Sequence, residues 1–231
     1  GTVEGTVTTT GAQTIAGEKT FTDTIIGNVR GNITATNLDV ESGASVSATE
    51  FIMKESLERT RLGYQALELF QFNSANSAFG HKALSTVVNS TESNNTAIGH
   101  SSLQRMLYGV NNTAVGTSSM QNVEGESTTT RNLQNTAVGY QSMMCDTADG
   151  AIDVNFNTAI GSNSLFRLGS ESQYNSAIGY EAGKLGGQTL NGSNNTFLGA
   201  QTRFNTNSAS YSNSTAIGYG AIIDSSNQIM I

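Results

Sequence analysis

The 231-residue chain carries a formal net charge of −7, and only 13% of its residues are charged, about half of the usual share. Lys and Arg are scattered, so no basic stripe could neutralise phosphates, and we expect no nucleic-acid binding. No run of about 18 apolar residues occurs, so we expect no membrane insertion. Ser, Thr and Asn make up roughly a third of the chain, a composition that favours short strands and tight turns over helices.

Residues 1–55 are predicted to form an irregular, β-rich fibre shaft that brings chains together. The stretch is rich in Gly, Thr and Asn, and its branched residues stand alone, so no single strand has enough apolar surface to fold by itself. Residues 27–34 repeat a Gly-Asn-apolar-polar unit with a period of four. Because association would bury the isolated apolar side chains, we expect this segment to be trimerising.

Residues 56–231 are predicted to form one repetitive head domain. From about Thr60 onward, a pattern close to Asn-Thr-Ala-Ile/Val-Gly occurs nine times. The motif glycines are Gly63, Gly80, Gly99, Gly116, Gly139, Gly161, Gly179, Gly199 and Gly218. Their spacing of 17 to 23 residues combines a constant unit with tails of variable length, which is typical of a solenoid. We therefore predict an all-β fold, a parallel β-solenoid of about nine coils.

Each coil is predicted to contain two short strands around a small apolar interior. Side chains alternate along a strand, so Thr and Ile of the motif share one face while Ala points to the other. After the glycine, which permits a bend, a second apolar position follows four residues on, as at Leu67 and Met120. The predicted roll core consists of Phe79, Ile98, Val115, Val138, Ile160, Ile178, Leu198, Ile217, Leu84, Leu103 and Leu165.

A column of Ala on the face opposite Ile is predicted to lie near a trimer axis. Ordering one coil loses on the order of 20 to 30 kcal/mol of conformational entropy, and its few large apolar side chains return only about 2 kcal/mol each. Neighbouring chains should add burial, and small side chains let backbones approach an axis closely. Phe197 interrupts the column, and it either lies at the axis or points into its own roll. The column consists of Ala78, Ala97, Ala114, Ala137, Ala159, Ala177 and Ala216.

The repeated unit, Asn-Thr-Ala-Ile/Val-Gly-x-x-Ala/Ser-Leu, resembles the heads of trimeric autotransporter adhesins, where a related Ser-Val-Ala-Ile-Gly motif builds left-handed parallel β-rolls. It resembles more closely the repeats of tail-fibre and surface-fibre proteins of phages and large DNA viruses. Residues 13–21 (QTIAGEKTF) are similar to a phrase of viral fibre shafts, and residues 225–231 (SSNQIMI) to the stretch before a self-cleaving trimerising chaperone. The resemblance implies a left-handed β-roll in a homotrimer whose chains are intertwined or lie side by side.

The resemblance also implies a function and a location. Such a fibre segment lies on the virion surface and mediates attachment to a host-cell glycan or receptor. The alternative is the head of a bacterial trimeric adhesin on the cell surface. Coils that are longer than those of bacterial adhesin heads, and Thr in the place of Val, favour the viral assignment.

The position after each motif glycine holds an aromatic ring or an imidazole in six of the nine units. A row of flat rings on a rod could stack on sugar rings of a glycan, or the rings could simply cover the neighbouring coil. Both interpretations stay open from the sequence. The candidate glycan or receptor contacts are Tyr64, His81, His100, Tyr140, Tyr180 and Tyr219.

Metal, cofactor and ion sites have weak support in the sequence. His81 and His100 lie on adjacent coils, but no Cys, Asp or Glu lies at ligand spacing, and we expect no metal and no cofactor. The long tails 121–133 and 144–156 could bind a partner, because insertions in solenoids tend to emerge on one face. Asp146, Asp149 and Asp153 in the second tail could hold a cation, although their spacing is not that of an EF-hand.

Catalysis and ice binding are the two remaining classes of function to consider. A polysaccharide-degrading tailspike needs paired carboxylates at a fixed distance, whereas the acidic residues here avoid fixed positions of the repeat. We therefore expect no enzymatic activity and assign no catalytic residue. Ice binding would need paired Thr on an exposed strand, whereas the motif has one Thr per coil that shares its face with Ile.

Overall fold

The computed structural model places all of its described residues in the repetitive part of the chain. The chain divides into two units, residues 1–50 and 51–231. The predicted shaft, residues 1–55, lies outside the described residues, and so does its proposed role in trimerisation. The structure describes residues 60–67, 75–85, 94–106, 109–123, 132–145, 154–169, 172–186, 189–205 and 210–231.

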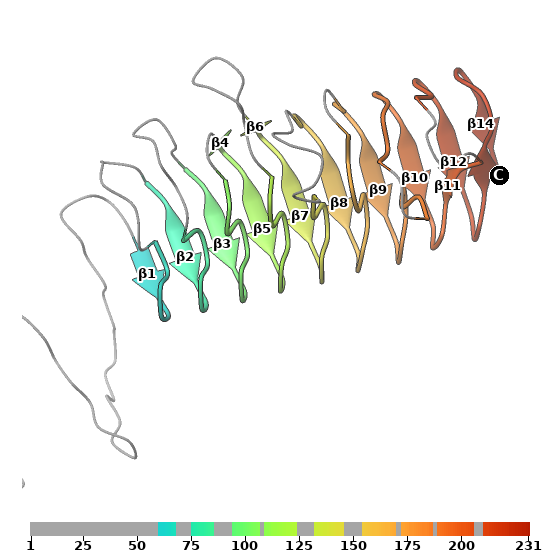
Figure 1. Ribbon diagram of the computed structural model, residues 1–231. Coiled ribbons are helices and arrows are strands. Elements are labelled where there is room, and N and C mark those ends of the chain that lie inside the picture. Colours follow the sequence, from blue (N-terminus) through green and yellow to red (C-terminus); the bar gives the residue numbers. More distant parts are fainter. Residues whose placement is uncertain are drawn as a thin grey trace, which may run out of the picture. The chain divides into compact units, whose positions relative to one another are not determined.

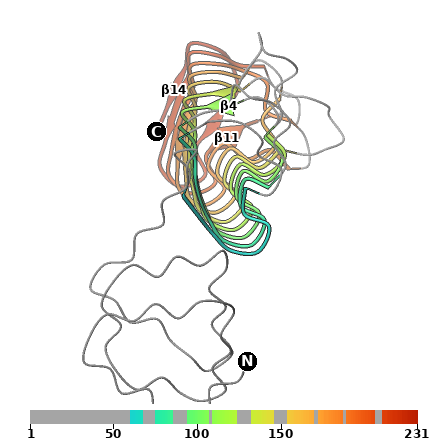
Figure 2. The same ribbon diagram turned by 90° about the vertical axis from the view of Figure 1, so that its left-hand side faces the viewer.

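The described residues form an all-β parallel β-solenoid (Figure 1), which confirms this part of the predicted fold class. Ten three- or two-residue strands, one from each motif copy and one at the C-terminal end, form a single parallel sheet, and the coils lie one behind another when viewed along the stack (Figure 2). In sheet order the strands are β1 (Thr60–Leu62), β2 (Ser77–Phe79), β3 (Thr96–Ile98), β5 (Thr113–Val115), β7 (Thr136–Val138), β8 (Thr158–Ile160), β9 (Ser176–Ile178), β10 (Thr196–Leu198), β12 (Thr215–Ile217) and β14 (Ile229–Met230).

Neighbouring strands pair in register, so each position of the motif forms a straight row along the solenoid. In the pairing of β3 with β5, Thr96 lies beside Thr113 and Ala97 beside Ala114. The same register relates β7 to β8 and β8 to β9. Because side chains alternate along a strand, the Ala row faces one side of the sheet, and the Thr and Ile/Val rows face the other.

The segment after each motif glycine is a tight turn, not the second strand that we expected. In the unit after Gly80, Lys82 has φ 57° and Leu84 has φ 49°, both in the left-handed region, and the equivalent residues of most other units share this conformation. A strand requires extended backbone, so alternate left-handed residues exclude one here. Backbone hydrogen bonds still join the coils, because Lys82 N donates to Tyr64 O and Leu84 N to Ser102 O.

Short second strands occur farther along some coils. β4 (Gly109–Val110) pairs with β6 (Asn132–Leu133), and β11 (Arg203–Phe204) pairs with β13 (Ile222–Ile223), in two separate parallel two-stranded sheets. β4 and β6 precede the motif asparagines Asn112 and Asn135, whereas β11 and β13 follow the motif glycines Gly199 and Gly218.

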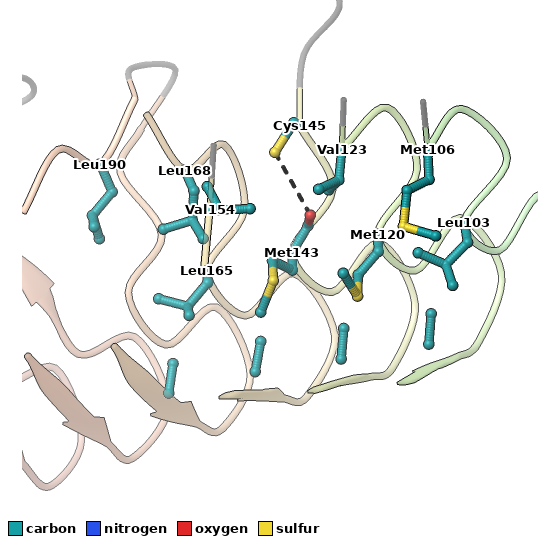
Figure 3. Packing of buried hydrophobic residues seen from close by; sticks show 14 of the residues in the cluster. Leu103, Met106, Met120, Val123, Met143, Cys145, Val154, Leu165, Leu168 and Leu190 are labelled. Carbon is teal, nitrogen blue, oxygen red and sulfur yellow. Dashed lines mark hydrogen bonds between the residues drawn. The ribbon is translucent and has the colours of Figure 1, made fainter. Parts of the chain in front are cut away.

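The core of the solenoid is built from small and large side chains that meet between the two walls. The Ala row of the sheet is fully buried, and Leu or Met side chains from the turns fill the space opposite it (Figure 3). Leu84, Leu103 and Leu165 are buried as predicted. Figure 3 also shows Cys145, which is buried and whose Sγ lies 3.8 Å from Met143 O.

The structure reverses the predicted roles of the two sheet faces. The alanines predicted at a trimer axis, Ala78 to Ala216, are 0% exposed inside their own chain, so they cannot lie between chains. The aliphatic residues predicted in the core point outward. Ile98, Val138, Ile160, Ile178, Leu198 and Ile217 are 37% to 46% exposed, and Phe79 and Val115 are half-buried. The narrow interior explains the reversal, because the Leu and Met side chains of the opposite wall leave room only for a methyl group on the sheet.

The environment of Phe197 shows the same limit on the volume of the interior. It replaces the motif Ala on β10 and is fully buried, so it points into its own roll. On the opposite wall Gly183 replaces the Leu or Met of the other units, and a Cβ built there would lie 3.2 Å from Phe197 Cδ2 and 2.6 Å from Leu165 Cδ2. A large residue on the sheet is therefore accommodated by loss of the large residue on the turn.

A ladder of buried asparagines closes the corner where the main-sheet strands from β2 to β10 begin. The Oδ1 atom of Asn135 accepts hydrogen bonds from Asn157 N at 2.9 Å and from Asn157 Nδ2 at 3.3 Å, and the Nδ2 of Asn135 donates to Val154 O at 2.8 Å. The same geometry links Asn157 to Asn175 and Asn175 to Asn195. Each side chain thus satisfies backbone groups at the corner of its own coil and of the next one, which explains why the motif begins with Asn.

Candidate functional site

The candidate site is the outer face of the ten-stranded sheet together with the rows of side chains along its two long edges. In the nine motif strands of this sheet, the outward positions hold Thr or Ser in one row and Ile, Val, Leu or Phe in the next. None of these outward residues is charged. We call this surface the outer sheet face. Over the ten strands of the sheet, at about 4.8 Å per strand, it runs for roughly 48 Å. An uncharged apolar strip of this length is unusual on a monomer and typical of an interaction surface.

The row after the motif glycines borders the outer sheet face at the ends of the strands. Its members Tyr64, Tyr140, Tyr180, Tyr219 and His100 are exposed, and His81 is half-buried. All six predicted contact residues therefore lie in one line along one edge.

The rings of this row are stacked at one end and separate at the other. Tyr64 and His81 are stacked with ring centroids 5.6 Å apart, and His81 and His100 with centroids 5.0 Å apart. From Thr117 onward the row alternates, so Tyr140 and Tyr180 lie two strands apart, about 9.6 Å, with Ser162 between them. The separate tyrosines have ring faces that no neighbouring ring in the row covers.

A second aromatic pair, which sequence reasoning missed, lies along the opposite edge. Phe156 and Tyr174 each precede a ladder asparagine, and their rings are stacked with centroids 4.8 Å apart. Both residues have positive φ, 58° and 56°, as do the asparagines that occupy this position in other units. The signal was present in the sequence as two aromatic residues at the same repeat position, but the position itself was not recognised as a row.

The two histidines are not arranged as a shared metal site. Their rings lie at an interplanar angle of 24° with centroids 5.0 Å apart, so the faces meet and the ring nitrogens, which coordinate in the ring plane, do not converge. No cluster of three or more His, Cys, Asp or Glu side chains occurs in the part of the chain that the structure describes. Asp146, Asp149 and Asp153 lie outside that part.

Sequence reasoning also missed a surface hollow on the opposite wall. It has a volume of about 440 Å³ and lies against the turns that follow Gly179 and Gly199. Among the described residues of its lining, Glu181 is the only one with a carboxylate. Of the two long tails, residues 124–131 and 146–153 lie outside the described residues, so their predicted roles stay predictions.

Comparison with known proteins gives no family assignment: no family model, no curated protein and no solved structure matches the chain. Within the described ranges, no helix has the length and apolar character needed to cross a bilayer. Inferences about function therefore depend on the surfaces of this chain itself.

Proposed function

We propose that this chain is a structural and adhesive segment of a virion fibre, which associates as a homotrimer through the outer sheet face and contacts host-cell glycans through its tyrosines. The observation that supports this proposal most directly is the uncharged apolar column on the outer sheet face. A rod that exposes seven aliphatic side chains in one line, from Leu62 to Ile217, has an apolar surface that its own fold does not cover.

The dimensions of the outer sheet face agree with those of a stable interface. Ten strands at about 4.8 Å span roughly 48 Å, and the three strand residues with one flanking residue on each side span about 16 Å. The product, close to 800 Å² per chain, is the usual contribution of one partner to a standard protein interface. The occupant that best matches a long, straight, uncharged face is another copy of the same face, because its rows repeat at the same interval.

The resemblance to fibre proteins supports three copies in parallel around an axis along the solenoid. With the Ala rows buried inside each roll, the side chains at this axis would be the Ile, Val and Leu of the motif, with Thr beside them. This arrangement replaces the predicted Ala axis and keeps the predicted trimer. It also buries the aliphatic column, which the fold of one chain leaves in water.

Charges placed on the outer sheet face are expected to dissociate the assembly. In the double variant Ile160→Lys and Ile178→Lys, two ammonium groups would have to be buried without partners, which costs several kcal/mol each. Light scattering after gel filtration should give three times the chain mass of 24.2 kDa for the unmodified protein and one chain mass for the variant, with an unchanged circular dichroism spectrum.

A matched control introduces two lysines, at Gln141 and Asn163. Both positions lie in the turns that follow motif glycines, and we call the surface formed by these turns the turn wall. Both residues are half-buried with φ 52° and 56°, and Lys82 occupies the equivalent position of an earlier unit, so lysine is compatible with the backbone there. The control should keep the mass of the unmodified protein. A monomeric unmodified protein at micromolar concentration, or an Ile160/Ile178 variant of unchanged mass, would contradict association through this face.

Loss of Tyr140 and Tyr180 is expected to abolish the binding of neutral glycans and to leave the oligomer intact. Each is 52% exposed at the edge of the outer sheet face, where a ring can stack on the apolar face of a sugar. Tyr174 at the opposite edge is 53% exposed, so Tyr174→Ala is the control for a general loss of aromatic surface. Binding of labelled protein to a glycan array, with an assay for released oligosaccharide, measures the effect.

Equal binding by the Tyr140/Tyr180 double variant and the unmodified protein would remove the tyrosine row from the proposal. Release of oligosaccharide from a bound glycan would instead favour the tailspike class, which needs two carboxylates at a fixed distance.

A further inference from the structure

The hollow on the turn wall lies where several residues differ from those usual at their repeat positions, among them Gly183, Phe197 and Arg203. It lies between the turns of two adjacent coils and is lined mainly by Glu181, Lys184, Leu185, Gln201, Arg203 and Phe204. Its volume of about 440 Å³ falls in the range of sites that hold small molecules, about 300 to 1,000 Å³.

Strand alternation places Arg203 outside the core. Arg203 stands where most other units have a buried Leu or Met, four residues after the motif glycine. Here the chain forms β11 instead of the usual turn, so successive side chains point to opposite sides. Phe204 is buried with its ring centroid 5.3 Å from that of Phe197, and Arg203 is exposed. The substitution at Phe197 and the exposure of a cation at the hollow are thus parts of one local rearrangement.

Lys184 is held in position by two neighbours. Its Nζ lies 2.6 Å from Glu181 Oε1 and 5.4 Å from the ring centroid of Phe166. The hydrogen bond from Lys184 lowers the pKa of the Glu181 carboxyl, and Gln201 Nε2 donates to the other carboxylate oxygen at 3.5 Å. Glu181 is therefore ionised at neutral pH and keeps Lys184 at the hollow.

Arg203 retains most of its donors for a ligand. In the described part of the chain, its guanidinium donates through Nη1 to Gln201 O at 3.3 Å. A guanidinium has five N–H donors in a planar fork that matches a carboxylate. The described lining residues thus carry two cations against one carboxylate, an excess of one positive charge on a chain whose net charge is −7.

We propose that this hollow binds an anionic sugar residue, of the uronate or sialate class, with its carboxylate on the Arg203 fork and on Lys184. The side-chain oxygen of Gln201 and the carboxylate of Glu181 can accept hydrogen bonds from sugar hydroxyl groups, and Leu185 and Phe204 form the apolar part of the lining. The site lies away from the outer sheet face and meets the tyrosine row only at Tyr180, whose side chain hydrogen-bonds the Glu181 carboxyl. Its ligand contacts through Arg203 and Lys184 go beyond the proposed function and do not depend on it.

The test uses the full chain and two probes of equal size, methyl β-D-glucuronide and methyl β-D-glucoside. We expect the amide signal of Arg203 to shift on titration with the glucuronide, and the neutral glucoside to bind at least tenfold more weakly, because it lacks the carboxylate. Arg203→Gln should weaken glucuronide binding at least tenfold, and Arg203→Lys should retain part of it. Lys82→Gln, which removes a cation from a distant coil, should have no effect.

Three outcomes would overturn the proposal: equal affinity for the two glycosides, unchanged affinity in Arg203→Gln with an unchanged circular dichroism spectrum, or displacement of the glucuronide by an equal concentration of sulfate. The last outcome would show a site for small anions only. None of these results bears on the oligomer or on the tyrosine row, so the failure of this inference is distinguishable from a failure of the proposed function.

Discussion

Replacing Asn135 with Ala is expected to lower the free energy of unfolding by about 3 to 5 kcal/mol. The change removes the hydrogen bonds that Asn135 makes to Val154 O and Asn157 N at a buried corner, whereas Asn157 Nδ2 keeps Ser172 O as a partner. A buried polar group without a partner costs about 1 to 3 kcal/mol. Denaturant unfolding followed by circular dichroism gives the total effect, and hydrogen exchange at the amide of Asn157 should locate it.

The control is an asparagine outside the ladder. Asn94 is exposed with φ 60°, so Asn94→Gly keeps the left-handed backbone and removes a side chain that contributes nothing to the corner. Its free energy of unfolding should change by less than about 0.5 kcal/mol. An Asn135→Ala protein as stable as Asn94→Gly, with slow exchange at Asn157, would show that the ladder is not what holds this corner.

Replacing Gly139 with Ala is expected to destabilise the solenoid by about 4 kcal/mol. The residue has φ 135°, which side chains rarely adopt, and its Cβ would lie 2.5 Å from Gly161 O and 2.6 Å from Gly161 C. Backbone strain costs about 1 to 3 kcal/mol, and forced overpacking about 1 to 3 kcal/mol more. The midpoint of denaturant unfolding measures the loss, and faster hydrogen exchange at the amides of the adjacent coils would show separation of the strands.

Gly186 provides the comparison for Gly139. A Cβ built on Gly186 has no heavy atom within 4 Å, and Gly186 is not among the glycines with positive φ. We expect Gly186→Ala to leave the unfolding midpoint nearly unchanged. If the two alanine variants were equally stable, the close approach of the motif glycines from coil to coil would have no energetic role.

The sequence was sufficient to predict the solenoid because its signal is periodic. The motif glycines recur at intervals near 19 residues, and every copy of the motif places a strand in the same sheet in the same register. The alternation of Thr, Ala and Ile was also predicted correctly, as was the common row of Tyr64, His81, His100, Tyr140, Tyr180 and Tyr219. These features depend only on local geometry that each unit repeats.

Which face of the sheet is the core could not be predicted, because alternation says that Ala and Ile face opposite sides and not which side is inside. The sequence prediction places Ala at a trimer axis, where small side chains let backbones approach, and this puts Ile in the interior. Leu84 and its equivalents, from turns whose left-handed residues were not foreseen, occupy that interior and leave space for Ala. Phe197 and Gly183, 14 positions apart in sequence, show the same dependence, because the large residue on the sheet faces a glycine on the turn.

The amino-acid sequence by itself therefore determined the repeat, the strand positions and the parallel stacking, since each follows from contacts between equivalent positions. Only the tertiary structure decided the inside and the outside of the sheet, the asparagine ladder and the hollow beside Arg203. Those features depend on the distance between two walls and on residues that meet across it, and a pattern along one strand carries no information about that distance.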